Sequence, residues 1–318
     1  MTILIGTDEA GYGPNFGPLL ISATAWQIPD DDNAIDLYRV LRKVVRADTS
    51  SEKHVPIADS KALYKPGGGW ANLERGLLSC SACAGQTVTT WREAWATFAR
   101  HEAGYLDEVP WYDGYDSALP ADLDVSDLQR CAERLASGLS EASVSLLHLR
   151  STAVFPARFN KLLDEHDSKG VALSHETLQL VKAVLEETAG ERVIIQCDKH
   201  GGRNKYGALL QTIFPDYLAE IVRESRETSI YRWGPASRRI QIRFTAKGES
   251  FLPTALASMA SKYLRELAMK AFNAFWATHV PDLKPTAGYP VDAKRFKADI
   301  EATQQQLGIE DRILWRRK

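Results

Sequence analysis

Runs of apolar residues predict a series of β-strands, and the first of them leads into two acidic side chains. Ile3 to Ile5 is followed, after Gly6 and Thr7, by the adjacent carboxylates Asp8 and Glu9. Successive strand residues point to opposite faces, so two neighbouring carboxylates can head the same way only where a strand is ending. We therefore expect the strand to end there, in a loop rich in glycine and proline. Leu19 to Gln27 then predicts a second strand, antiparallel to the first.

A later strand also ends at a carboxylate. Arg192 to Cys197 is a nearly continuous apolar run, which is typical of a strand buried in the middle of a sheet. A helix predicted over Ser174 to Thr188, with Ser174 as its N-cap, precedes it, and this order implies a crossover and a parallel neighbour. The strand ends in Asp198, before a loop with two glycines. Ligands in α/β folds lie at the carboxyl ends of strands, so Asp198 is a candidate site residue.

The remaining periodicity completes an α/β chain. Apolar residues at helical spacing predict a long helix over Pro253 to Phe275, with small Ala and Ser residues near its start. Other predicted helices cover residues 34–46, 70–78, 121–139 and 206–213, and other predicted strands cover residues 143–155, 228–233 and 239–244. The fold class that follows is a mixed central sheet flanked by helices.

Residues 66–143 form an aromatic-rich stretch, which we interpret as an insertion into a single domain spanning residues 1–318. Aromatic side chains can stack on unpaired bases. Aromatics spaced along helices more often fill a small core, and we favour that interpretation here. The aromatics concerned are Trp91, Trp95, Phe98, Tyr105, Trp111, Tyr112 and Tyr115.

Arginines alternate with apolar residues near residue 240, and this predicts a strand pair with one basic face. The arginines are Arg232, Arg238, Arg239 and Arg243. Such faces are usually only solvated, but beside an acidic metal site this one could guide a phosphate backbone.

Composition changes this picture little. The 318 residues are 44% hydrophobic and 25% charged, with a net charge of −2, which excludes a uniformly basic nucleic-acid binder but not a local basic groove. The sequence shows no signal peptide and no apolar run of membrane-spanning length, so we expect a cytoplasmic protein. Cys80 and Cys83 form a CxxC without a second pair or a nearby histidine, and we expect them to have no metal or redox role.

The string from Asp8 to Leu19, DEAGYGPNFGPL, resembles the opening motif of the type 2 ribonucleases H, the ribonuclease HII and HIII family. Three further blocks agree with this resemblance. Asp59-Ser60-Lys61 is similar to the Asp-Ser-Lys motif, and Lys247-Gly248-Glu249 before an Ala/Ser-rich helix is similar to Lys-Gly-Asp. Ala287 to Tyr289 resembles the C-terminal Gly-Tyr motif, within a C-terminal helical segment and basic tail at residues 281–318.

The resemblance implies a ribonuclease H-like fold and a metal-dependent endoribonuclease. Its substrate would be the RNA strand of RNA–DNA hybrids, or ribonucleotides embedded in duplex DNA. The implied metal ligands and catalytic residues are Asp8, Glu9, Asp198 and Glu249. Carboxylate oxygens suit Mg²⁺ or Mn²⁺, and two ions would act in the in-line displacement. The implied substrate-binding residues are Gly11, Tyr12, Gly13, Ser60, Lys61, Lys247 and Tyr289.

Two positions depart from the family pattern. Tyr12 stands where the family has Arg or Lys, and Glu249 stands where it usually has Asp. The alternatives that stay open are a catalytically weak relative that binds nucleic acid and a nuclease of the same fold acting on DNA. Asp59 or Ser60 could also simply cap a helix, with Lys61 as a solvated side chain. The sequence indicates no membrane partner and identifies no protein partner.

Overall fold

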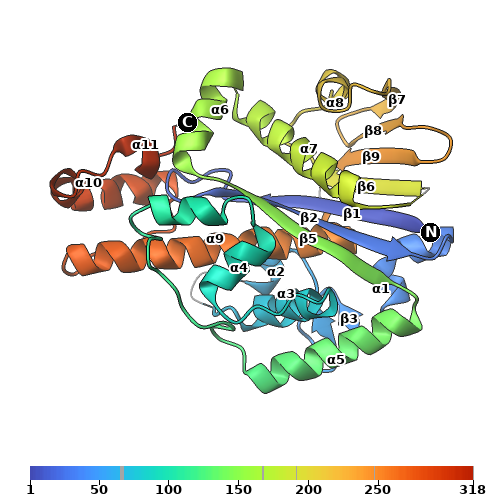
Figure 1. The fold of residues 1–318 in the computed structure, drawn as a ribbon, viewed down its shortest axis with the longest axis horizontal. Helices are drawn as coiled ribbons and strands as arrows, with labels where there is room; N and C mark the ends of the chain where they lie inside the picture. Colours follow the sequence, from blue (N-terminus) through green and yellow to red (C-terminus); the bar gives the residue numbers. More distant parts are fainter. Residues whose placement is uncertain (65–67, 167, 191, 247, 318) are drawn as a thin grey trace.

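A seven-stranded mixed sheet organises the chain, in the strand order β5-β2-β1-β6-β9-β8-β7 (Figure 1). The computed structural model describes residues 1–64, 68–166, 168–190, 192–246 and 248–317. The sheet strands are β1 (Thr2–Ala10), β2 (Leu19–Ile28), β5 (Ser145–Val154), β6 (Arg192–Asp198), β7 (Glu220–Glu224), β8 (Thr228–Trp233) and β9 (Arg239–Thr245), and β3 (Val45–Arg46) pairs separately with β4 (Val55–Pro56).

Helices surround this sheet on both faces. They are α1 (Leu37–Val40), α2 (Ser60–Leu63), α3 (Ala71–Cys83), α4 (Trp91–Phe98), α5 (Val125–Glu141), α6 (Pro156–His166), α7 (Lys169–Glu187), α8 (Gly207–Ile213), α9 (Leu252–His279), α10 (Pro290–Gln306) and α11 (Asp311–Leu314). Short 3₁₀ turns lie at η1 (Asp32–Ile35), η2 (Ala103–Glu108) and η3 (Gly248–Ser250). The predicted α/β class, a mixed central sheet flanked by helices, is confirmed.

The centre of the sheet is parallel, as the buried strand predicts. β6 pairs in parallel with β1 on one side and with β9 on the other. β2 returns antiparallel to β1, and β8 and β7 extend the other edge as antiparallel strands. The carboxyl ends of β1, β6 and β9 therefore meet at one edge of the sheet.

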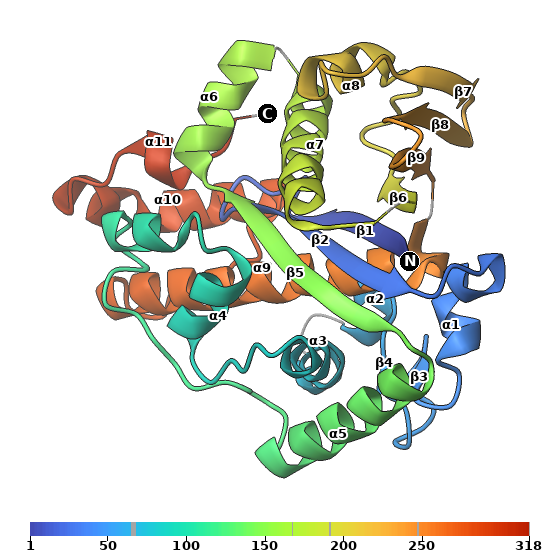
Figure 2. The same ribbon diagram turned by 45° about the vertical axis from the view of Figure 1, so that its right-hand side comes forward.

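Two hydrophobic cores lie on opposite faces of the sheet. α7 and α8 cover one face over Ile3, Ile5 and Ile195, while α9 covers the other, passing beneath β1, β2 and β5 (Figure 2). Gly6 of β1 allows this helix to approach, because a Cβ there would lie 2.1 Å from the Thr254 nitrogen. Close packing at this point fixes the start of α9 against β1, beside the acidic end of that strand.

Three sequence predictions are wrong in detail. β1 does not end at Asp8 and Glu9, because its ladder with β2 continues to the pair Ala10↔Leu20, although its pairing with β6 stops at Thr7. The helix predicted over residues 34–46 is only the four-residue α1, since Val45 and Arg46 pair instead with β4. Ser174 is not an N-cap: α7 begins at Lys169, and the Ser174 hydroxyl donates back to the Gly170 carbonyl within the helix.

The aromatics of the segment at residues 66–143 pack in the interior, which confirms that part of the interpretation, but they share one core with α9 and the sheet and do not form a small core of their own. Trp91, Trp95 and Phe98 are fully buried, and the Trp91 indole N–H donates to the Leu267 carbonyl of α9. The buried Glu74 carboxylate accepts the backbone N–H groups of residues 121–123 and the Tyr263 hydroxyl of α9. That this segment is an insertion stays a prediction.

The CxxC pair carries no disulfide. Cys80 and Cys83 are both free, and burial raises the pKa of each thiol above its ordinary value. Across the described parts of the chain, no helix combines the length and the apolar character needed to cross a bilayer.

Candidate active site

The fold brings three of the predicted acidic residues to one edge of the sheet. Asp8 and Glu9 lie on β1 just beyond Thr7, where the pairing with β6 stops, and Asp198 is the last residue of β6. Asp8 and Glu9 are each partly exposed, so a ligand can reach them. The carboxylates of two neighbouring strands therefore lie just beyond the last pair of the parallel ladder, Thr7↔Cys197.

The charges of these carboxylates act on one another. Burial raises the pKa of Asp8, a hydrogen bond with Ser258 lowers it, and the charge of Asp198 raises it again. Burial likewise raises the pKa of Glu9, and the charges of Asp8 and Asp198 raise it further. The positive charge of Lys61 acts in the opposite direction and lowers the pKa of Glu9. Acidic side chains are thus concentrated at this edge, and each raises the pKa of its neighbours.

A divalent cation fits this donor set chemically. Desolvated carboxylates that repel one another gain most from a hard cation, and their oxygens are the ligands that Mg²⁺ and Mn²⁺ prefer. Within the described residues, however, no three His, Cys, Asp or Glu side chains are grouped tightly enough to hold an ion. One oxygen of Asp198 accepts the Gly248 N–H at 2.9 Å, which directs this carboxylate toward η3.

The fourth predicted ligand is placed only by its backbone. Glu249 lies in η3, directly after Gly248, but its side chain belongs to the part of the chain that the structure does not describe. Lys247 also lies outside the described residues.

A chain of buried hydroxyls fixes α9 beneath the acidic end of β1. The Ser261 hydroxyl donates to the Asp8 carbonyl at 3.0 Å and lies 2.8 Å from the Ser22 hydroxyl on β2. Ser22 in turn contacts the Ser151 hydroxyl on β5 at 2.7 Å. These contacts tie three strands and one helix together at a single point. From the sequence, Ser261 is recognisable only as a small residue that permits close packing.

The predicted loop Gly11-Tyr12-Gly13 and Tyr289 lie side by side. A Cβ on Gly13 would be 4.0 Å from the Tyr289 ring, and both residues are exposed. Gly11 has φ +85°, and a Cβ there would lie 2.5 Å from the Arg265 side chain, so only glycine fits.

The Tyr12 side chain reaches the start of α7 and the loop after β6. Its hydroxyl lies near Gly170 and Gly201, where a Cβ would be 3.8 and 3.4 Å away respectively. Burial and the charge of Glu9 raise the pKa of this hydroxyl above its ordinary value. Tyr12 is thus packed between the start of α7 and the loop after β6, beside the acidic edge.

The Asp59-Ser60-Lys61 motif has a structural role in two of its three residues. Asp59 is the N-cap of α2, and its carboxylate accepts the backbone N–H of Lys61 at 2.6 Å. Ser60 is buried, and its hydroxyl lies 3.1 Å from that of Ser258, the residue that also bonds to Asp8. Lys61 is exposed and close enough to Glu9 to affect its pKa. Lys61 is therefore the residue of the motif that can reach a substrate.

Arg316 is a buried residue at the glycine loop that sequence reasoning missed. Its guanidinium donates to the Gly11 and Pro14 carbonyls and lies 4.7 Å from the centre of the Phe159 ring. Asn15 makes two hydrogen bonds with the backbone of Arg316. The Arg316 N–H donates to the Asn15 carbonyl at 2.9 Å, and the Asn15 side-chain amide donates to the Arg316 carbonyl at 2.7 Å. Burial and the nearby Arg265 lower the pKa of Arg316 to about 9. The basic tail was the only sequence signal.

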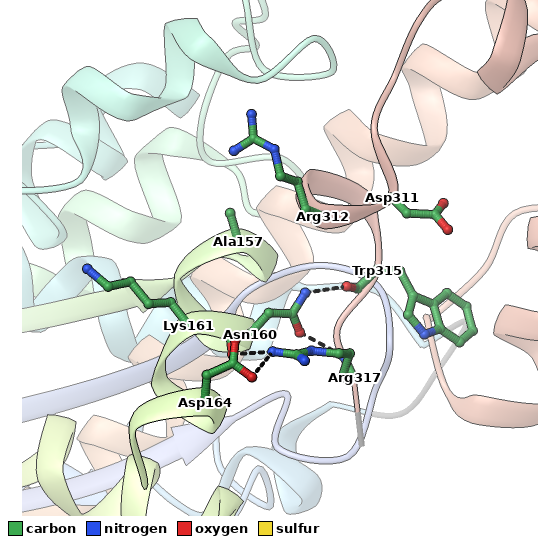
Figure 3. Close-up of a pocket in the computed structure, with 8 residues that line it drawn as sticks. All are labelled: Ala157, Asn160, Lys161, Asp164, Asp311, Arg312, Trp315 and Arg317. Atoms are coloured by element: carbon green, nitrogen blue, oxygen red, sulfur yellow. Dashed lines mark hydrogen bonds and ion pairs between the residues drawn. The ribbon is translucent and has the colours of Figure 1, made fainter. Parts of the chain in front are cut away.

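The neighbours of Arg316 attach the same tail to α6 (Figure 3). Asn160 donates to the Trp315 carbonyl at 2.9 Å and accepts the Arg317 N–H at 2.8 Å. The Arg317 guanidinium also binds Asp164 at 2.6 Å. An open pocket of about 490 Å³ lies between α6 and the tail, lined by Ala157, Asn160, Lys161, Asp164, Asp311, Arg312, Trp315 and Arg317.

A second open pocket, of about 480 Å³, adjoins Asp198. It is lined by Asp198, Lys199, Gly202, Asn204, Arg226 and Ala246. Lys199 donates to Asn204 at 2.7 Å and to the Ser225 carbonyl at 2.6 Å, so it connects the loop after β6 to the β7–β8 hairpin. The pocket gives the acidic edge an opening beside this hairpin.

Comparison with known proteins gives structural neighbours only. No family model and no curated protein matches the sequence. The fold is similar to ribonuclease HII from Archaeoglobus fulgidus, solved in complex with PCNA, with a TM-score of 0.45, 14% identity and coverage of 99% of this chain and 94% of that one.

Two other neighbours carry related names. Ribonuclease H2 from Pyrococcus horikoshii OT3 gives a TM-score of 0.46 and 17% identity over 98% of this chain and 92% of that one. Bst-RNase HIII in complex with Mn²⁺ gives a TM-score of 0.41 and 14% identity over 99% of this chain and 66% of that one. These are type 2 ribonucleases H, the family that the motifs resemble.

Proposed function

We propose that this protein is a metal-dependent endoribonuclease that hydrolyses the RNA strand of RNA–DNA hybrids, or ribonucleotides embedded in duplex DNA. The observation that carries the proposal is the meeting of Asp8, Glu9 and Asp198 at the open end of the β1–β6 ladder, with their charges acting on one another. The glycine loop and Tyr289 lie together nearby, which supplies a second element that a nucleotide can contact.

In this proposal, Asp8, Glu9, Asp198 and Glu249 would hold Mg²⁺ or Mn²⁺, as two ions. Bound metal supplies an activated water and stabilises the leaving 3′-oxygen, so that the products carry a 5′-phosphate and a 3′-hydroxyl. Asp198 could ligate an ion and keep the Gly248 N–H, because a carboxylate has about four lone-pair sites. Ser258 and Ser261 orient the Asp8 side chain and backbone from beneath.

Substrate recognition falls to the other residues at this edge. Backbone groups of Gly11 and Gly13 can approach a 2′-hydroxyl closely, which is the contact that distinguishes RNA from DNA. The exposed Tyr289 ring can pack against the adjoining sugar, and Lys61 can neutralise a phosphate beside Glu9. Ser60 has no such role here, because it is buried against Ser258.

The test is cleavage of three labelled duplexes in Mg²⁺ and in Mn²⁺: one bearing a single ribonucleotide, one full RNA–DNA hybrid and one all-DNA duplex. We expect metal-dependent cleavage at ribonucleotides, reduced roughly 100-fold or more by Asp8→Asn. Asp216→Asn, at an exposed carboxylate after α8, is the matched control and should cleave like the parent. Cleavage of the all-DNA duplex alone would redirect the proposal to a DNA nuclease. Tight binding without any cleavage would leave a nucleic-acid-binding relative.

A further inference from the structure

The half of the sheet beyond β6 has one face that no helix covers among the described residues. α7 and α8 pack on the buried side of β8 and β9, whereas α9 runs beneath β1, β2 and β5 and reaches only as far as β6 (Figure 2). Exposed and buried residues alternate along β9 as a result: Ile240, Ile242 and Phe244 are buried, and Arg239 and Arg243 are exposed.

Strand register shows which side chains share this open face. Residues paired directly across a ladder point to the same side of the sheet. Ile230 of β8 pairs with Arg243, Arg232 pairs with Gln241, and Arg223 of β7 pairs with Ile230. Four arginines from three strands therefore lie on one surface, which we call the arginine face: Arg223, Arg232, Arg239 and Arg243.

The arginine face continues to the candidate active site. In the β6–β9 ladder Gln196 pairs with Arg243 and Asp198 pairs with Thr245. Asp198 and Arg243 thus point to the same side of the sheet, diagonally across neighbouring strands, with their Cα atoms roughly 8 Å apart. From there the positive charge runs along β9 to Arg239, about 20 Å from the Thr245 end of the strand.

The part of the chain that the structure describes gives these guanidinium groups little neutralisation. Within the described residues, Arg223, Arg239 and Arg243 have no carboxylate partner, and Arg232 donates only its Nε–H, to the Gln241 side chain. Glu220, at the outer edge, is the one acidic residue of β7, β8 and β9 on this surface. Arg238, the remaining arginine of the sequence pattern, turns to the other side and donates to the Leu185 and Thr188 carbonyls at the end of α7.

We propose that the arginine face binds the phosphate backbone of the duplex beyond the cleavage site. Guanidinium groups match phosphate oxygens through paired N–H donors, and an exposed row of them is electrostatically complementary to a polyanion. The inference rests on the proposed function for the position of the cleavage site, but the binding itself needs only the exposed arginines. The face extends the acidic centre into a surface of opposite charge, so that the duplex is held by its backbone while the reacting phosphate lies at the carboxylates.

The test measures binding of a labelled RNA–DNA hybrid by anisotropy at several salt concentrations. Asp8→Asn is the background, so that the hybrid stays intact. Adding Arg239→Gln and Arg243→Gln should remove two phosphate contacts. The negative slope of the logarithm of the association constant against the logarithm of the salt concentration should then become shallower by about 2, at about 0.9 per lost contact, and the Kd should rise about tenfold. Arg130→Gln/Arg134→Gln on the distant α5 makes the same change in net charge, and should leave both values unchanged.

The possible outcomes separate this inference from the proposed function. An unchanged slope and Kd in the arginine-face variant, with a parent that binds, would overturn the inference and leave the nuclease proposal standing. A changed slope in the arginine-face variant, together with a parent protein that cleaves no duplex, would support binding at the arginine face and overturn the nuclease proposal. Failure of the parent to bind the hybrid would overturn both. Equal binding of a polyglutamate peptide at the same face would overturn the inference in favour of an acidic protein partner.

Discussion

At the scale of single residues, the acidic edge destabilises the protein in which it lies. Burial and mutual repulsion raise the pKa values of Asp8 and Glu9 above the ordinary values of 3.8 and 4.5. The folded state therefore keeps protons that the unfolded state has already released, and stability falls as pH rises from about 4 through the raised pKa values. Bound metal would remove this cost, because it stabilises the ionised form.

A thermal scan in EDTA tests this residue-level effect. Asp8→Asn should unfold a few degrees above the parent at pH 8 and close to it at pH 5, where the parent's carboxyls are already protonated. Adding Mn²⁺ should raise the midpoint of the parent more than that of the variant. If the unfolding midpoints of Asp8→Asn and the parent differed by the same amount at pH 5 and pH 8, the ionisation of Asp8 would not be linked to folding.

Arg316 is the second residue whose effect can be isolated. Arg316→Gln removes the donors to the Gly11 and Pro14 carbonyls, so the glycine loop loses its support from below. We expect kcat/KM on a ribonucleotide substrate to fall roughly 10- to 100-fold, because small displacements of positioning groups are costly. Arg316→Lys should restore part of the loss.

The adjacent residue provides the matched control for Arg316. Arg317 contacts Asn160 and Asp164 of α6 and not the loop, so Arg317→Gln should change kcat/KM little. The ratio of kcat/KM on ribonucleotide and deoxyribonucleotide substrates is the measurement that distinguishes the two roles of Arg316. It should change if Arg316 positions the glycine loop, and stay the same if Arg316 only stabilises the fold. A variant at Arg316 that loses stability but keeps its discrimination would contradict the positioning role.

At the scale of elements, a single carboxylate couples α3 and residues 121–123 to α9. Glu74 of α3 is fully buried and accepts four hydrogen bonds, three from backbone N–H groups of residues 121–123 and one from Tyr263. The burial of the Tyr263 hydroxyl and the charge of Glu74 both raise the pKa of that tyrosine. The helices at residues 66–143 are thus held to the helix that supports the acidic edge.

Glu74→Gln should destabilise the protein by about 2–4 kcal/mol, since an amide offers one acceptor oxygen and places an NH₂ group against backbone donors. Urea unfolding gives the free energy directly, with Glu133→Gln on the exposed side of α5 as the control. A loss below about 0.5 kcal/mol would mean that the neighbouring backbone rearranges to accept the amide.

Element boundaries show what local patterns can and cannot predict. The continuous apolar run of β6 identified a buried parallel strand, because only a strand covered on both faces needs no polar side. The periodicity of residues 34–46 was misleading, since Val44 and Val45 serve a strand pair with residues distant in sequence. The end of β1 was also misplaced, because its two ladders stop at different residues.

At the scale of the whole molecule, the sequence was informative where a motif is contiguous. Asp8 and Glu9 could be named from a contiguous motif and Asp198 from the end of a buried strand, and the structure brings them to one edge. The Ser22–Ser151–Ser261 contacts and the docking of Arg316 could not be predicted, because each joins residues that only the folded chain brings together. The arginine face could be predicted in part. The alternation of arginines and apolar residues predicts a basic side of the sheet, whereas the strand pairing shows that Arg223 belongs to it, and the hydrogen bonds of Arg238 show that this arginine does not.

The docking of the tail also sets the order in which the molecule can be completed. Asn15 and Arg316 hold each other across 301 positions of sequence. On a ribosome, the strands and carboxylates of the acidic edge emerge long before Arg316 does, since domains form during synthesis from the N-terminus onward. A nascent chain can therefore assemble its sheet without a supported glycine loop. In the proposed function, selection of ribonucleotides would therefore begin only after Arg316 has emerged and bound the loop.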